Sequence, residues 1–302
     1  MTAPDQASPT GQDTPPTCYR HPGRETWVSC VRCGRHACPD CLRQAAVGQQ
    51  CVDCVRGTGQ GGQGARAART VFGGRPAGGA VVTWSLVAIN VAVFLLTWVR
   101  PSVVTNLEML GYASYGYGGP PHGVAAGEWY RLVTSAFLAP ATGQGSLGIL
   151  DIAFNMWALV FVGPALEGLL GRLRFLALYL LSAVGGGVMY YFLAAQNAGA
   201  VGASGAIFGL FGAWFVAARR LRVDTRGIAT LIVLNLALSF IWHTAIAWQD
   251  HVGGLLTGAL ITAAFLYAPR RNRVAWQAAA VAVVAAALVI AVVVRTGQLT
   301  AV

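Results

Sequence analysis

Two residues in the apolar part of the sequence, Ser204 and His251, are the types that together catalyse acyl transfer. Ser204 stands in the run Gly202-Ala203-Ser204-Gly205, and His251 follows 47 residues later, just before Gly253-Gly254. A serine hydroxyl becomes a nucleophile when a nearby histidine accepts its proton. The alternative is that the serine bonds its own backbone and the glycines serve only helix packing. The helices that carry Ser204 and His251 decide between catalysis and packing.

Composition predicts an all-α polytopic membrane protein. Of 302 residues, 55% are hydrophobic and only 11% are charged, against about 25% charged in soluble domains. Several apolar runs approach the length of about 20 residues that spans a bilayer. The runs predict seven helices, at 80–99, 148–168, 173–194, 203–220, 227–245, 250–268 and 274–294.

The distribution of arginine predicts the topology. The net charge is +10 and the chain has no lysine. Arginines gather in alternate connections, near residues 172–174, 219–226 and 270–273, whereas 195–202 and 246–249 have none. Positive loops stay on the cytoplasmic side. We therefore expect a multi-pass protein of the cell membrane, with its N-terminus in the cytoplasm and its C-terminus outside.

Counting helical rise places three polar residues at similar depth. Ser204 lies fifteen residues before Arg219, or about 22 Å above the inner boundary, and His251 lies about 28 Å above Arg270. Asn155 lies about 18 Å above Glu167. All three fall in the outer half of a hydrocarbon core about 30 Å thick. Buried polar groups in membranes are usually functional, which favours chemistry over packing alone.

All seven cysteines lie in the first 54 residues and predict metal binding. Residues 17–55 contain Cys-x-x-His once and Cys-x-x-Cys three times, which makes eight ligands for two structural Zn²⁺ ions. A disulfide scaffold is the alternative, but the odd number of cysteines and the histidine that completes a pair argue against it. The ligands are Cys18, His21, Cys30, Cys33, Cys38, Cys41, Cys51 and Cys54.

Four further segments complete the predicted organisation. We predict that residues 1–16 form a disordered tail. Residues 56–79 are predicted to form a flexible basic linker suited to an anionic membrane surface. We expect a helical core at 80–270 and a seventh helix with a tail at 271–302. The cysteine-rich module would bind a cytoplasmic protein partner. Nucleic-acid binding is not expected, because acidic residues dilute its arginines.

These residues resemble the motifs of the rhomboid family of intramembrane serine proteases, over about residues 80–270. The resemblance rests on the Ser204 motif, on His251 with its two glycines, and on Asn155 within Phe154-Asn155-Met156. Tyr130-Arg131 looks like that family's Trp-Arg loop element. Six helices plus one C-terminal helix is a known layout in the family. The first module resembles B-box zinc fingers, which implies interleaved pairing, although the spacing alone also allows sequential pairing.

The resemblance implies a serine–histidine dyad without a carboxylate. Ser204 would be the nucleophile and His251 the general base, with Asn155 and the Ser204 N–H stabilising the oxyanion. Phe208, four residues after Ser204, would stack on His251, and Gly202 and Gly205 would support the site. Asp151 stands where the family usually has histidine. Asp250 is not expected to complete a triad, because adjacent helix positions point in different directions.

The resemblance also implies the partners, which are the lipid bilayer and transmembrane protein substrates cleaved near their outer ends. One alternative is a catalytically silent rhomboid-like scaffold that binds transmembrane helices, for which Asp151 is the main argument. A third hypothesis is that the protein is a transporter, but its intramembrane polar residues are few and no inverted repeat is apparent in the sequence.

Overall fold

The computed structural model describes residues 15–45, 48–55, 79–114, 119–139 and 146–301. The chain divides into two compact units, residues 1–68 and 69–302. The first contains all the cysteines and the second contains the apolar helices. The tail and the linker that the sequence predicts, 1–16 and 56–79, fall almost entirely outside the described residues.

The N-terminal unit is built from two small antiparallel pairs of strands and very short helices. Its buried centre is made almost wholly of cysteine side chains, with Ala37 and Leu42 beside them. So little apolar surface explains why the segment needs another source of folding energy, such as bound metal. Its elements are β1 (Thr17–Cys18) paired with β2 (His21–Glu25), η1 (Pro39–Cys41), β3 (Leu42–Gln44) paired with β4 (Gln49–Cys51), and α1 (Val52–Val55).

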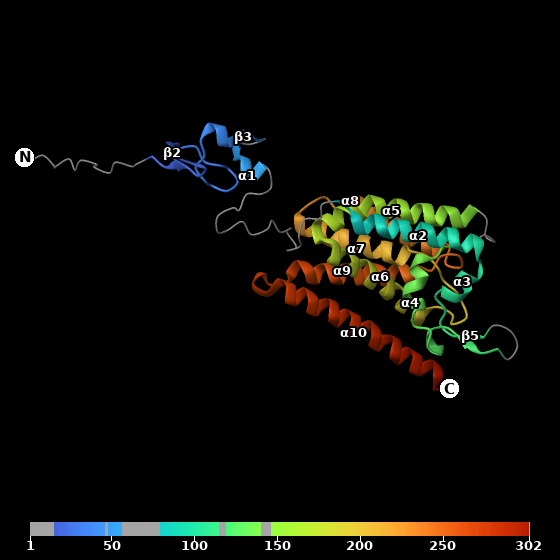
Figure 1. The fold of residues 1–302 in the computed structure, drawn as a ribbon. Coiled ribbons are helices and arrows are strands. Elements are labelled where there is room, and N and C mark those ends of the chain that lie inside the picture. Colours follow the sequence, from blue (N-terminus) through green and yellow to red (C-terminus); the bar gives the residue numbers. More distant parts are fainter. Residues whose placement is uncertain (1–14, 46–47, 56–78, 115–118, 140–145, 302) are drawn as a thin grey trace, which may run out of the picture. The chain divides into compact units, whose positions relative to one another are not determined.

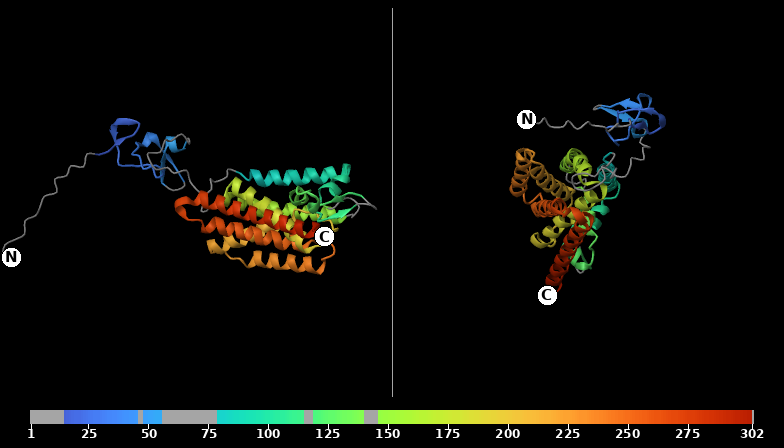
Figure 2. Two further views of the ribbon diagram at one scale, coloured as in Figure 1. Left: turned by 90° about the horizontal axis from the view of Figure 1, so that it is seen from below. Right: turned by 90° about the vertical axis from the view of Figure 1, so that its left-hand side faces the viewer.

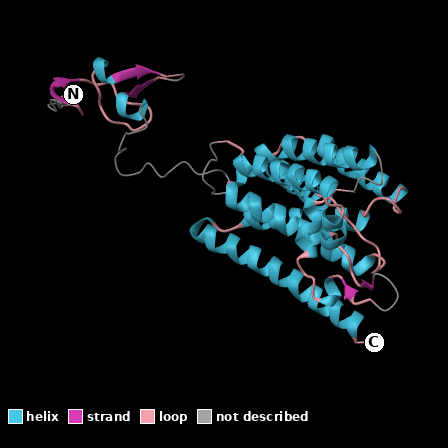
Figure 3. Ribbon diagram, turned by 45° about the vertical axis from the view of Figure 1, so that its right-hand side comes forward, coloured by secondary structure: helices cyan, strands magenta, loops and turns pink. Residues whose placement is uncertain are grey.

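The second unit is a bundle of long helices whose axes run side by side (Figures 1 and 2). Helix α10 lies along the edge of the bundle against α6 and α9, and α8 contacts α7 and α9. Among the described residues of this unit, strands are confined to one short pair in the α2–α5 connection (Figure 3). The long helices are α2 (Val81–Val99), α5 (Ser146–Leu170), α6 (Arg172–Leu193), α7 (Ser204–Leu221), α8 (Arg226–Ile241), α9 (Trp248–Tyr267) and α10 (Arg273–Thr300).

These seven helices correspond to the seven apolar runs, with two differences at their ends. Helix α8 stops at Ile241 instead of 245, and α10 continues to Thr300 instead of 294. By length and hydropathy, four helices among the described residues are able to cross a membrane: α2, α5, α6 and α10. Helices α7 and α9 are long enough but less apolar, because they carry many glycines and several polar residues.

Helix α7 is the centre of the bundle and touches α5, α6, α8 and α9. Its closest neighbour is α9, and glycines make the contact. A methyl group at Gly254 would overlap the backbone carbonyl of Gly205, and one at Gly258 would overlap that of Gly209. The two backbones therefore touch directly over about one helical turn, as small residues allow in membranes.

Buried polar side chains fix the outer helices. Glu167 on α5 is fully buried and accepts hydrogen bonds from the N–H groups of Val82 and Thr83, at 3.0 and 2.9 Å. A carboxylate at the start of α2 also complements the helix dipole. Gln277 on α10 donates to the Phe265 carbonyl of α9 at 3.0 Å and accepts from Arg174 of α6 at 2.7 Å. These bonds replace those that water would supply outside a membrane.

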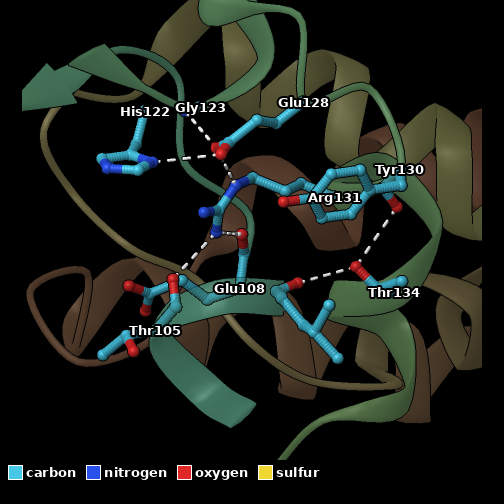
Figure 4. A network of polar contacts seen from close by, with 9 residues as sticks. Thr105, Glu108, His122, Gly123, Glu128, Tyr130, Arg131 and Thr134 are labelled. Atoms are coloured by element: carbon cyan, nitrogen blue, oxygen red, sulfur yellow. Dashed lines mark hydrogen bonds and ion pairs between the residues drawn. The ribbon is translucent and has the colours of Figure 1, made fainter. Parts of the chain in front are cut away.

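The connection between α2 and α5 is held together by a buried arginine. Arg131, 1% exposed, donates to Glu128 at 2.7 Å and to the backbone carbonyls of Thr105 and Glu108 at 3.0 and 2.9 Å (Figure 4). The same carboxylate accepts the N–H of Gly123 at 2.6 Å. One ion pair thus binds distant parts of the connection to each other. Its short elements are α3 (Ser102–Leu107), β5 (Ala113–Ser114), β6 (Pro121–His122), η2 (Val124–Ala126), α4 (Arg131–Thr134) and η3 (Ser135–Phe137).

Gly258→Ala should lower the thermal unfolding temperature in detergent, because the added methyl group must push α7 away from α9. Overpacking of this kind typically costs about 1–3 kcal/mol. Gly297→Ala is the matched control. Gly297 lies on α10 with nothing near its missing side chain, so that change should be neutral or stabilising. Equal effects of the two substitutions would show that the α7–α9 contact is not tight.

Glu128→Gln should destabilise the protein in a pH-dependent manner. Burial would raise the pKa of Glu128, but hydrogen bonds from Gly123, His122 and Arg131 outweigh it and lower that pKa to about 2. The ionised group therefore stabilises the fold above its unfolded-state pKa of about 4.3, and this contribution is lost as the pH falls toward 2. The difference in unfolding temperature from wild type should be large at pH 7, about half as large at pH 3 and small at pH 2. A difference that does not change with pH would contradict this assignment.

Candidate active site

Ser204 is the first residue of α7, and the turn before it is held by the α2–α5 connection. Gly202 has a φ of +139°, a conformation that favours glycine, and its N–H donates to the Ser135 carbonyl at 3.0 Å. Ala200 and Met109 exchange two backbone hydrogen bonds, at 2.8 and 2.9 Å. The start of α7 is thus fixed to the connection that Arg131 organises. Ser204 itself is half-buried.

His251 lies in the first turn of α9 and is 7% exposed. Its ring stacks on that of Phe208, with 4.2 Å between the centroids and 10° between the planes. Phe208 is one helical turn after Ser204, so both project from the same face of α7. The stacking therefore brings the imidazole to the face of α7 that begins at Ser204.

Asp250 turns away from His251 and toward the start of α7. A methyl group at Gly205 or at Gly186 of α6 would overlap its carboxylate, which accepts a hydrogen bond from the Gly205 N–H. Gly205 thus admits an acidic cap that suits the positive end of the α7 dipole. Asp250 is a capping residue of the serine helix, and the expectation that it is not part of a triad agrees with this placement.

Asn155 and Asp151 lie one turn apart on α5, which packs against α7. Asn155 is 8% exposed, and its side chain hydrogen-bonds the Asp151 carboxylate. One oxygen of Asp151, Oδ2, is buried with no hydrogen-bond partner among the described residues. The carboxylate therefore holds the amide of Asn155 instead of turning to water.

One contact of His251 was not predicted from the sequence. Ser239, near the end of α8, lies with its Oγ atom 2.8 Å from His251 Nδ1. It belongs to no motif, and its hydroxyl is one of several polar groups on α8, which also carries Thr230 and Asn235. Ser239 and His251 are twelve residues apart and lie on two helices joined by a turn. Helical periodicity therefore could not predict their contact.

The eight Cys and His ligands of the N-terminal unit form two clusters. The first is Cys18, His21, Cys38 and Cys41, and the second is Cys30, Cys33, Cys51 and Cys54. This is the interleaved pairing that the B-box resemblance implied, and not sequential pairing.

The geometry of both clusters suits a tetrahedral metal ion. A tetrahedral site with Zn–S bonds of about 2.3 Å places its sulfurs about 3.8 Å apart. The Sγ atoms of Cys33 and Cys51 are 3.8 Å apart, and His21 Nδ1 lies 3.4 Å from Cys38 Sγ. Burial raises the pKa of Cys18 and Cys30, but hydrogen bonds outweigh burial and lower each pKa to about 6. That favours the thiolate, the form that binds metal, at these two positions. Burial and the neighbouring cysteines raise the pKa of Cys41 to about 11 and that of Cys54 to about 12, so metal binding would have to displace their protons.

The fold and the placement of Ser204 and His251 define a class: a polytopic helical membrane protein with a buried polar site between its central helices. Residues 126–268 match the model of the Rhomboid domain. The chain is 35% identical over 156 residues to YdcA, a rhomboid-type protein of Bacillus subtilis, covering 73% of that protein and 50% of this chain. It belongs to the rhomboid family.

Two further relatives carry protease names. The chain is 33% identical over 188 residues to Rhomboid protease GluP of Bacillus subtilis, which is 60% of this chain and only 34% of that protein. It is 26% identical over 231 residues to Rhomboid protease AarA of Providencia stuartii, or 66% of this chain and 77% of that protein. The chain thus spans only about a third of the length of GluP, and the Rhomboid-domain match, residues 126–268, lies within the helical unit.

Proposed function

We propose that this protein is an intramembrane serine endopeptidase that cleaves transmembrane segments of membrane proteins with a Ser204–His251 dyad. The observation that carries the proposal is the stacking of His251 on Phe208, one turn from Ser204. If His251 faced lipid or only supported the fold, its ring would not have to be fixed beside a serine at the start of a helix. The protease names of the relatives support the same reaction.

The reaction follows from these positions. His251 accepts the proton of Ser204 Oγ while that oxygen attacks the scissile carbonyl carbon. The resulting imidazolium donates its proton to the leaving amine, and the C–N bond breaks to leave an ester on Ser204. A water molecule, deprotonated by His251, then hydrolyses the ester and restores the serine.

The oxyanion of the tetrahedral intermediate needs hydrogen-bond donors. The Ser204 N–H is at the start of α7, where backbone N–H groups are free of helical partners and the helix dipole is positive. The Asn155 amide would be the second donor, with Asp151 fixing which end of the amide is presented. Removing one such donor typically costs about 100- to 1,000-fold in rate.

Apolar cavities beside α8 are suited to a substrate helix. One of about 320 Å³ lies between α5, α7 and α8 and is lined by Trp157, Phe161 and Trp214. Another, of about 300 Å³, lies on the other side of α8, against α7 and α9. A substrate helix in this region would have to unwind locally to expose a peptide bond, so glycine or proline near the cleavage site is expected.

A catalytically silent scaffold is the second candidate. It is favoured by one observation, the carboxylate of Asp151 beside Asn155, because a negative charge near the oxyanion would oppose catalysis. Labelling by a fluorophosphonate probe separates the two candidates. Labelling of Ser204 in the folded protein supports the protease, and its absence supports the scaffold.

Ser204→Ala and His251→Ala should each abolish cleavage of a model transmembrane substrate by the purified protein in detergent or vesicles. Without the nucleophile or the base, the remaining donors cannot form the acyl-enzyme. His243→Ala, which changes an exposed histidine at the end of the α8 region, is the matched control and should cleave at the wild-type rate. Cleavage that survives in Ser204→Ala would disprove the dyad.

We further propose that the N-terminal unit holds two structural Zn²⁺ ions and docks a cytoplasmic protein. In this arrangement the N-terminus lies in the cytoplasm of a cell-membrane protein and the C-terminus lies outside. The donor sets, three thiolates with one imidazole and four thiolates, are typical of closed zinc sites without a position for substrate. The zinc therefore has a role in folding and none in hydrolysis.

The purified chain should contain two equivalents of zinc by elemental analysis. Cys30→Ser should reduce this to one equivalent, because its cluster loses a ligand while the other is intact. His36→Ala is the control, since His36 belongs to neither cluster. Chelation should make residues 17–55 sensitive to proteolysis and should leave probe labelling of Ser204 unchanged. Zinc content unaffected by Cys30→Ser would refute the assignment of the cluster.

A further inference from the structure

The Nδ1 edge of the His251 ring contacts a hydroxyl group of α8. Ser239 Oγ on α8 lies 2.8 Å from His251 Nδ1, and the two side chains are 2% and 7% exposed. Ser239 is also the one buried residue of α8. When a buried imidazole nitrogen has one hydrogen-bond partner, that partner determines whether the nitrogen carries a hydrogen.

A second contact of Ser239 fixes the direction of this hydrogen bond. Ser239 Oγ lies 2.7 Å from the backbone carbonyl of Asn235, one turn earlier on α8. A carbonyl only accepts, and a serine hydroxyl has only one proton. The Ser239 hydroxyl therefore donates its hydrogen to the backbone carbonyl of Asn235. At the other contact Ser239 Oγ must accept, so His251 Nδ1 must carry a hydrogen.

We propose that Ser239 is a positioning residue that holds neutral His251 in the tautomer protonated at Nδ1, which leaves the Nε2 lone pair free. The inference rests on the proposed function, because it supplies the state in which His251 can act as a base. The Ser204 proton would move to Nε2, and the imidazolium would keep its Nδ1–H on Ser239 Oγ. The proton then leaves from Nε2 to the amine, and Nδ1 never changes state.

Two contacts together fix the orientation of the His251 ring. Stacking on Phe208 sets the plane of the imidazole but still allows a flip of about 180° around the Cβ–Cγ bond, which exchanges the positions of Nδ1 and Cδ2. The Ser239 contact prevents that rotation and distinguishes the two nitrogens. Asp250, the neighbouring carboxylate, is directed to Gly205 and Gly186 and does not take this role. A neutral hydroxyl thus occupies the position that a carboxylate has in a serine–histidine–aspartate triad.

The test compares Ser239→Ala with Ser239→Thr. The alanine variant should lower kcat for a model transmembrane substrate by about 5- to 100-fold, the range for a buried donor left without its acceptor, with KM little changed. The threonine variant keeps a hydroxyl that can bond the same carbonyl and should restore most of the rate. Ser182→Ala is the matched control, because it removes a fully buried hydroxyl of α6 that has no partner among the described residues.

A spectroscopic measurement separates positioning from general loss of structure. Nitrogen NMR of protein labelled with ¹⁵N-histidine, with the His251 signals assigned by their loss in His251→Gln, should show hydrogen on Nδ1 and none on Nε2. Ser239→Ala should shift the population toward the Nε2-protonated form. The same spectra in a Ser204→Ala background need no activity, so they test the tautomer even if the protein proves not to be a protease. Hydrogen on Nε2 in the wild type, or a spectrum unchanged in Ser239→Ala, would overturn the inference.

Discussion

The direct contact between the backbones of α7 and α9 is the constraint on which the rest of the site depends. Because Gly254 and Gly258 have no side chains, the two helices approach until the carbonyl oxygens of Gly205 and Gly209 fill the space where methyl groups would be. Only at that distance can a ring on α9 stack on a ring of α7. Dispersion and polar contacts drive helix association in lipid, where no hydrophobic force acts between helices. Tight packing and a preorganised site therefore have the same cause.

The serine end of the site is fixed from two other directions. From the connection, Arg131 and its partners hold the segment whose Ser135 carbonyl binds the turn before Ser204. From α9, Asp250 caps the first turn of α7 through Gly205. A nucleophile at a helix start is exposed to fraying, because the first N–H groups lack helical partners. These contacts oppose fraying at the residue where a small displacement would matter most to catalysis.

Much of the fold could be predicted from residue types and their order along the chain. Apolar length located every long helix, and Cys-x-x-Cys spacing identified the ligands of both metal clusters. The predicted ends of α8 and α10 were wrong by several residues, because hydropathy does not show where a helix stops: α8 ends before residues 242–245, and α10 continues through the largely polar residues 295–300. The pairing of Ser239 with His251, and the direction of Asp250, depend on how neighbouring helices rotate about their axes. Periodicity within one helix contains no such information.

The apolarity of the individual helices also bears on how the protein is made. Helices α2, α5, α6 and α10 are each long and apolar enough to enter a bilayer by themselves, whereas α7 and α9 do not meet that criterion. The two helices that carry Ser204 and His251 are stabilised in lipid by each other and by α6. During biosynthesis they must therefore be retained beside helices already inserted. Ser204 and His251 are then brought together only when α7 and α9 pack against each other, so a partly assembled chain lacks the paired site.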